Sequence, residues 1–146
     1  MNLEGYLSND SNITKCISES DLIIGSVYLT GKKAPTIITR SMLEQIKPGT
    51  VLVDISIDQG GCFETSKPTT HQDPTFLIDD ILHYCVSNMP GAVPLTASES
   101  LNSASLSYVQ KLANNDLNLL LNEQDFKSGL NIMAGEFRHP SLIDII

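Results

Sequence analysis

A carboxylate followed by two glycines is the first group in this sequence that could do chemistry. Asp58 comes after the apolar run Val51–Ile57 and is followed by Gln59-Gly60-Gly61. The glycines could let a ligand approach the backbone closely. The carboxylate could orient a ribose or a substrate ammonium, or take part in proton transfer. A turn carboxylate that caps the next segment is the competing interpretation, and composition alone favours it.

Asn88 is a second candidate, because it follows the apolar run Leu82–Val86. Its side chain could hydrogen-bond a cofactor, or the residue could simply begin the Met89-Pro90 turn. A metal site is not expected, because the available ligands lack the Cys-x-x-Cys and His-x-x-x-His spacings that hold zinc. Those ligands are Cys62, His71, His83 and Cys85.

Composition narrows the classes of protein and partner. The 146 residues carry 9 Lys and Arg against 17 Asp and Glu, a net charge of −8, so no nucleic-acid partner is expected. No apolar run is long enough for a membrane span, and no secretion signal is visible at the start. Three cysteines without a close pair argue against a disulfide scaffold. We therefore expect a cytoplasmic globular protein that needs no membrane.

The elements that must position these residues are predicted from the apolar runs. Leu22–Leu29 and Val51–Ile57 lack alternation, which predicts parallel strands buried on both faces. Ser41–Lys47 predicts a short helix between them, and Leu82–Val86 predicts a third strand. Ligands bind at the carboxyl ends of such strands. The segments at those ends are Tyr28–Pro35, Asp58–Gly61 and Asn88–Pro90.

A long loop and several helices are predicted for the rest of the chain. Gln59–Pro74 is rich in Thr, Gly and Pro, and loops of this length are usually functional. Thr96–Glu99 has capping-box spacing and predicts a helix start. Asn114–Asp116 predicts the end of that helix and the cap of a second one, and Phe126–Ile146 predicts loop and short helix. The expected apolar face of the first helix contains Leu101, Ser105, Tyr108 and Leu112.

Two longer stretches carry more information than any single residue. Ile55–His71 and Tyr84–Pro94 closely resemble the signature stretches of alanine dehydrogenases. Asp21–Pro35 resembles the strand and loop that precede them in that family, so the resemblance runs in order through almost the whole chain. Nicotinamide nucleotide transhydrogenases share the architecture and a related Gly-Gly segment. The run Cys62–Thr70 looks more like the dehydrogenase.

This resemblance implies an α/β fold, namely the second half of a doubly wound Rossmann-type parallel sheet followed by C-terminal helices. It also implies NAD-dependent oxidative deamination of L-alanine to pyruvate and ammonium, with Asp58 as the catalytic carboxylate beside the nicotinamide. Intact members of the family form homo-oligomers. The residues that it implies for contact with NAD are Ser8 near the adenosine half, Val27, Tyr28, Ile55, Ser56, Ile57 and Asp58 at two strand ends, and Val86, Ser87, Asn88 and Met89 near the nicotinamide ribose.

The resemblance covers only part of such an enzyme. No three glycines have the Gly-x-Gly-x-x-Gly spacing of a dinucleotide fingerprint, and the family's substrate residues lie mostly upstream of the matching part. We therefore expect a C-terminal portion, inactive alone, that needs an N-terminal half. Residues 1–95 would form a partial NAD-binding domain and residues 96–146 the C-terminal helices. The alternatives are a non-catalytic module that binds a nucleotide or a partner, and a transhydrogenase-like nucleotide-binding fragment.

An open sheet edge is a further expectation. In the doubly wound order, Leu22–Leu29 pairs with a strand of the other half, so alone it leaves an apolar edge exposed. We expect the chain to be marginally stable, to self-associate or to need a complementing chain. A monodisperse monomer that melts reversibly in two states would contradict this expectation.

Overall fold

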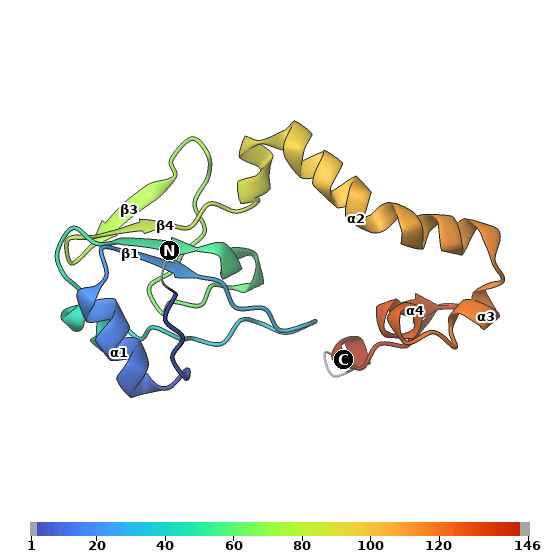
Figure 1. Ribbon diagram of the computed structural model, residues 1–146, viewed down its shortest axis with the longest axis horizontal. Helices are drawn as coiled ribbons and strands as arrows, with labels where there is room; N and C mark the ends of the chain where they lie inside the picture. Colours follow the sequence, from blue (N-terminus) through green and yellow to red (C-terminus); the bar gives the residue numbers. More distant parts are fainter. Residues whose placement is uncertain (1–2, 144–146) are drawn as a thin grey trace. The chain divides into compact units, whose positions relative to one another are not determined.

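The computed structural model of the protein describes residues 3–143 (Figure 1). These residues form two compact units, which divide between Met89 and Pro90. The expected domain boundary after residue 95 stays a prediction. The expected tail Phe126–Ile146 lies outside the described residues at positions 144–146.

The first unit is a four-stranded sheet with one helix and two 3-10 turns. Its strands run in the order β1-β2-β4-β3, with β1, β2 and β4 parallel and β3 antiparallel to β4. The α/β class with a mainly parallel sheet is thus confirmed, although β3 is an addition that the apolar runs did not predict. The elements are α1 (Asp10–Glu19), β1 (Leu22–Gly25), η1 (Ser41–Gln45), β2 (Val51–Asp54), η2 (Ile55–Gln59), β3 (Thr75–Ile78) and β4 (Ile81–Tyr84).

The strands are shorter than their apolar runs predict. β1 ends at Gly25 rather than at Leu29, and β2 ends at Asp54. The Asp54 side chain accepts a hydrogen bond of 2.9 Å from the backbone N–H of Ser56, which caps η2. The prediction that residues 55–57 continue the strand is therefore wrong, because a side-chain cap turns them into a 3-10 helix.

The two faces of the sheet differ in burial. Leu22 and Ile24 of β1 are 56% and 57% exposed, whereas Ile23 packs against the core. Burial of this strand on both faces was thus predicted wrongly. Among residues 3–143, β1 is an edge strand whose one strand neighbour is β2, and the core lies on one side of the sheet only. An apolar parallel edge of this kind can pair with a further strand.

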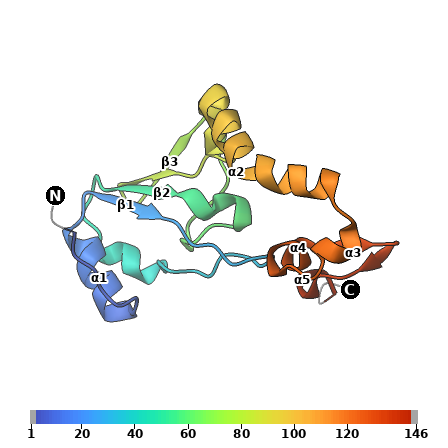
Figure 2. The same ribbon diagram turned by 45° about the vertical axis from the view of Figure 1, so that its right-hand side comes forward.

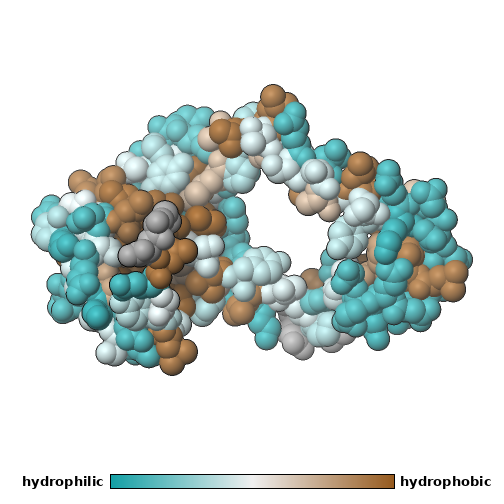
Figure 3. All heavy atoms as spheres, in the orientation of Figure 1, coloured by the Kyte–Doolittle hydropathy of each residue, from teal (hydrophilic) through white to brown (hydrophobic). Residues whose placement is uncertain are grey.

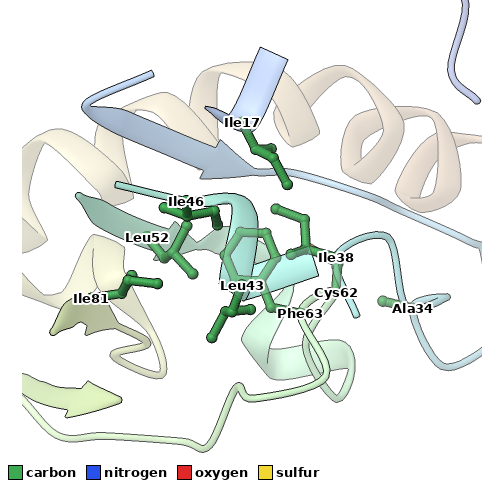
Figure 4. Packing of buried hydrophobic residues seen from close by; sticks show 9 residues of the cluster. All are labelled: Ile17, Ala34, Ile38, Leu43, Ile46, Leu52, Cys62, Phe63 and Ile81. Atoms are coloured by element: carbon green, nitrogen blue, oxygen red, sulfur yellow. The ribbon is translucent and has the colours of Figure 1, made fainter. Parts of the chain in front are cut away.

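The core of the first unit joins the sheet to α1, η1 and the connecting segments. Cys62 and Phe63 belong to it, although Gln59–Pro74 was predicted to be a functional loop. The carbonyl of Cys62 accepts a hydrogen bond of 2.7 Å from the N–H of Ile37, and further backbone hydrogen bonds hold the loop after this residue. This part of the loop is therefore structural. Figure 4 shows the packed residues Ile17, Ala34, Ile38, Leu43, Ile46, Leu52, Cys62, Phe63 and Ile81.

The short helical segments follow local capping only in part. η1 begins at Ser41 as predicted, but as a 3-10 turn without a side-chain cap. The sequence reasoning missed α1, whose cap is clear in the structure, because the Asn9 side chain accepts a bond of 2.9 Å from the Asn12 N–H. Ile13 and Ile17 then face the core from one side of this helix.

The second unit is mostly helical (Figure 2). α2 begins at Pro94 rather than at Thr96, because proline suits the first turn of a helix. Asp116 caps α3 as predicted, by accepting a bond of 2.8 Å from the N–H of Asn118. The division between the units falls within η3 (Met89–Ala92). The elements that follow it are α2 (Pro94–Asn114), α3 (Leu117–Leu120), α4 (Gln124–Gly129), β5 (Ile132–Met133), β6 (Glu136–Phe137) and α5 (Pro140–Ile143).

Apolar side chains remain at the surface of this unit. α2 buries none of its residues, and Leu101 of the predicted apolar face is 70% exposed. Tyr108 of that face packs edge-on against Phe126, with 5.8 Å between the ring centroids. Figure 3 shows hydrophobic residues on the surfaces of both units. Within residues 3–143, no helix has both the length and the apolar character needed to cross a bilayer.

Candidate functional site

A single hydroxyl group joins the carboxyl ends of β1 and β2. Ser56 Oγ accepts a hydrogen bond of 2.7 Å from the N–H of Val27 and donates one of 2.9 Å to its carbonyl. Ser56 is 6% exposed, and both bonds are partly buried. A serine hydroxyl can donate and accept at once. It therefore holds the chain beyond Gly25 in place, where the strand ladder has already ended.

Asp58 joins the carboxyl ends of β2 and β4 in a similar way. Its Oδ2 accepts a hydrogen bond of 3.3 Å from the backbone N–H of Asn88. Asn88 has a φ of 53°, and its carbonyl lies 3.1 Å from Nε2 of His71. One oxygen of Asp58 therefore holds a segment 30 positions away, and this bond is not the predicted cap of the next segment. The exposed position of the residue also leaves the carboxyl group accessible to a ligand.

A pocket of about 250 Å³ lies between these strand ends. Exposed Tyr28 and Ile55 give it apolar surface, while Ser56, Asp58 and Gln59 give it polar groups. The side-chain oxygen of Gln59 is buried and accepts no hydrogen bond from the described residues. The lining consists of Ser26, Val27, Tyr28, Ile55, Ser56, Asp58 and Gln59.

The structure gathers some of the predicted site residues here and places others elsewhere. Ser8 lies at a separate, mainly apolar cavity of about 360 Å³ beside α1 and β1. Ile57 and Val86 are 4% and 0% exposed, so their side chains pack inside the first unit. Ser87 and Met89 do not line the pocket of Asp58. Asn88 does not line it either, and a role in binding a cofactor stays a prediction for every one of the predicted site residues.

The glycines after Asp58 are required by the backbone conformation of the turn. Both have positive φ, 94° for Gly60 and 78° for Gly61, so the backbone itself requires glycine. A Cβ on Gly60 would lie 2.7 Å from a carbon of Lys33, and one on Gly61 would lie 2.9 Å from Asp54 Oδ2. Protein atoms thus lie on the Cβ side of both glycines, while the approach of a ligand to this backbone stays a prediction. The glycines serve the turn and its packing.

Asp54 is the residue that the sequence reasoning missed. Its side chain is fully buried, and its oxygens accept hydrogen bonds from the N–H groups of Ser56 and Cys62 at 2.9 and 2.8 Å. Ser66 Oγ also donates to it. An aspartate inside the apolar run Val51–Ile57 was the available signal, because a buried carboxylate must be surrounded by donors.

The buried cysteines and histidine of the first unit are not available as nucleophiles or bases. Burial, reinforced by the charge of Asp54, raises the pKa of the Cys62 thiol to about 12. Burial also raises the pKa of Cys85 and lowers that of His83. His83 is held by Thr65 Oγ1 at 2.8 Å and by the carbonyl of Ile81 at 3.0 Å. Among residues 3–143, no cluster of three or more acidic, histidine or cysteine side chains could hold a metal ion.

Comparison with known proteins decides the family. Residues 2–140 match the family model described as "Alanine dehydrogenase/PNT, C-terminal domain". The chain belongs to this family. The same stretches that tie β1, β2 and β4 together at their carboxyl ends are those that resemble alanine dehydrogenase in sequence.

Individual members of the alanine dehydrogenase/PNT family support the assignment. The chain is 49% identical over 143 residues to alanine dehydrogenase from Halomonas elongata, covering 97% of this chain and 38% of that protein. It is 43% identical over 142 residues to alanine dehydrogenase from Staphylococcus saprophyticus, covering 96% and 38%. The chain thus spans about 38% of the length of these relatives and corresponds to the C-terminal part of the enzyme.

Solved structures agree with this result. A structure titled L-alanine dehydrogenase superposes with a TM-score of 0.77 at 43% identity, covering 95% of this chain and 40% of the other. The transhydrogenase from Sinorhizobium meliloti gives 0.56 at 23% identity, covering 90% and 35%, which shows a shared fold alone. Of these two structures, the one titled L-alanine dehydrogenase is the more similar to this chain in both sequence and structure.

Proposed function

We propose that this chain supplies the cofactor-facing C-terminal part of an NAD-dependent alanine dehydrogenase. The supporting observation is that the family's sequence match coincides with a pocket at the carboxyl ends of β1 and β2 whose accessible polar group is Asp58. The reaction would interconvert L-alanine with pyruvate and ammonium. The family match also supports a homo-oligomer, and three free cysteines support a reducing, cytoplasmic setting.

The residues present fit one end of a nicotinamide cofactor. Tyr28 and Ile55 are 73% and 51% exposed beside the pocket, so they offer apolar surface to a planar ring. The volume of about 250 Å³ is below the roughly 300–1,000 Å³ of complete ligand sites. Such a half-site is expected where the rest of the binding surface comes from another segment.

Asp58 would handle the proton in this reaction. NAD, when bound, accepts the hydride from the substrate Cα at its nicotinamide ring. Oδ2 of Asp58 is held by the N–H of Asn88, while Oδ1 accepts no hydrogen bond from the described residues. Oδ1 can therefore bind the substrate ammonium or exchange a proton with the water that hydrolyses the imine. Ser56, through its two hydrogen bonds to the backbone of Val27, would hold Val27 and the neighbouring Tyr28 in place beside the pocket.

The open edge of β1 supports the need for a further segment. Leu22 and Ile24 are exposed on a parallel edge strand, and a parallel sheet is normally covered on both faces. We propose that the part preceding this region in the relatives pairs with that edge and carries the substrate-binding residues. Residues 1–146 alone would then lack activity.

A chimera tests the proposed function. The portion of Halomonas elongata alanine dehydrogenase that precedes its matched region is fused to this chain, and NADH-dependent reductive amination of pyruvate is measured. We expect activity in the chimera and none in the chain alone. Replacing Asp58 by Asn should lower kcat by about 100-fold or more.

Asp80→Asn is the matched control. It removes the same charge from the turn between β3 and β4, at the opposite end of the strands, where asparagine tolerates the φ of 58°. We expect its kcat to stay within about twofold of the unmodified chimera. A folded chimera without activity, or one in which Asp58→Asn behaves like Asp80→Asn, would contradict the proposal.

A further inference from the structure

We propose that Asp54 is a positioning residue of this site, whose buried carboxylate sets the places of Ser56 and Asp58 without touching a ligand. The proposal rests on the proposed function for its catalytic consequence. Its structural content, namely that Asp54 controls the conformation at Val27 and Asn88, can be measured independently of activity.

The hydrogen bonds of Asp54 fill both of its oxygens. Oδ1 accepts from the Ser56 N–H at 2.9 Å, and the Cys62 thiol lies 3.4 Å away. Oδ2 accepts from the N–H groups of Cys62 and Phe63 at 2.8 and 3.4 Å, and from the Ser66 hydroxyl. All of these donors are uncharged, and the side chain has no exposure to solvent. The buried carboxylate is therefore stabilised by hydrogen bonds from uncharged donors, and no cation among them compensates its burial.

The side-chain amide of an asparagine cannot accept the same set of hydrogen bonds as the Asp54 carboxylate. Each carboxylate oxygen accepts from a backbone N–H, one from Ser56 and the other from Cys62. In either orientation, an asparagine would turn an NH₂ donor toward one of these N–H donors. Asp54→Asn should therefore displace either η2 or the start of the segment that follows Gly61. Even this near-isosteric change would alter the backbone.

Asp54 affects the pocket through two residues of η2, Ser56 and Asp58. The Oδ1 side caps η2 and fixes Ser56, whose hydroxyl holds both backbone groups of Val27. Asp58 lies two residues further along η2 and holds the N–H of Asn88. Asp54 itself does not line the pocket. It acts on the site through η2, which is the reason to call it a positioning residue.

The Oδ2 side holds the turn that follows η2. Gly61, with a φ of 78°, brings the backbone so close that a Cβ there would lie 2.8 Å from the Cβ of Ser66 and 2.9 Å from Asp54 Oδ2. The glycine is thus required by the carboxylate and the serine together. Ser66 is the one side-chain hydroxyl that donates to Asp54 among the described residues, and it can be removed without disturbing the backbone donors.

Thr50, which lies next to the same strand, offers a matched control. It precedes β2 at the amino end, is 2% exposed, and donates its hydroxyl to the carbonyl of Ser20 at 3.3 Å. Thr50→Val removes a buried hydrogen bond at the end of β2 remote from the pocket. It should lower the melting temperature without altering the carboxyl ends of the strands.

The test compares Asp54→Asn, Ser66→Ala and Thr50→Val in the chimera. We expect Asp54→Asn to lower kcat by roughly 10- to 100-fold per folded molecule and to raise the KM for NADH, because misplaced groups lose catalysis steeply. Ser66→Ala should lower kcat several-fold. Thr50→Val should leave kcat within about twofold while lowering the melting temperature. A purely structural role would instead make kcat per folded molecule equal in all variants, which would overturn the proposal.

A second readout uses the 146-residue chain without any activity. In nitrogen–proton correlation spectra, Asp54→Asn and Ser66→Ala should shift the amide signals of Val27 and Asn88, and Thr50→Val should not. Unmoved signals in Ser66→Ala would overturn the proposal even where Asp54→Asn fails to fold. If the unmodified chimera is inactive, the proposed function fails, while the amide signals still decide the role of Asp54.

Discussion

The two units of the chain differ most in how much they bury. Every buried apolar side chain among the described residues except Leu120 belongs to the first unit. The second unit contains the longest helix, α2, which buries none of its 21 residues. Regular secondary structure alone therefore does not indicate where the stability lies. In water, a helix depends on tertiary packing of its apolar face, and among the described residues no side chain of α2 is buried by such packing.

The two units also differ in where their polar side chains form contacts. In the first unit, the buried side chains of Asp54 and Ser56 connect different segments, and the bond between Ser56 and Val27 joins residues 29 positions apart. In the second unit, the contacts of Lys111 with Glu123 and Phe126 lie at the surface. Surface ion pairs contribute little to stability. The candidate site thus lies in the unit that is able to hold a precise geometry.

Removing a core side chain should have the largest effect on this comparison. Leu52 is fully buried at the centre of the sheet, so Leu52→Ala should lower the free energy of unfolding of the first unit by about 2–5 kcal/mol. Leu101→Ala, at a residue 70% exposed, should change the free energy by no more than about 0.5 kcal/mol. Urea denaturation monitored by circular dichroism measures both. Similar losses in the two variants would show that α2 is packed in solution.

Alanine substitutions at two glycines, one in each unit, should change stability by smaller amounts and in opposite directions. Gly61→Ala combines a positive φ with close contacts to Ser66 and Asp54, and should destabilise the first unit by about 1–3 kcal/mol. Gly129 in α4 has no atom within 4 Å of a Cβ built on it, so Gly129→Ala should stabilise by about 0.4–1 kcal/mol. Thermal melting measures both variants. A Gly61→Ala protein with an unchanged melting temperature would contradict the close packing at Gly61.

The pH dependence of stability should distinguish the units least strongly. Burial lowers the pKa of His83 in the folded state, so the unfolded chain binds a proton at this residue more readily. The contribution is fully present above about pH 6.5, the unfolded value, and is lost as the pH falls from there through the folded pKa. His83→Gln should remove this part of the acid-side decline in melting temperature. His71→Gln, at an exposed histidine, should leave it, and equal profiles for both variants would contradict the assignment.

Several features of the fold and site were predictable from local patterns. The apolar runs located β1, β2 and β4, and Asp116 was identified as a helix cap. The signature stretches correctly indicated the family. The ends of the strands were predicted too late, because apolar residues such as Ile55 and Ile57 fit both a strand and a capped 3-10 turn. β3 and α1 were missed, because their apolar patterns are short.

By itself, the sequence determined the α/β class, the family and the candidate carboxylate Asp58, because these depend on residue types and on their order. Tertiary structure alone decided that Asp54 is a buried acceptor, that Gly60 and Gly61 face protein atoms, and that Ser8 lies at a different cavity. The open edge at β1, by contrast, was predicted from the doubly wound strand order, and the strand order of the described residues confirms it. The physical reason is that burial and hydrogen bonding depend on segments distant in sequence, which no local pattern specifies.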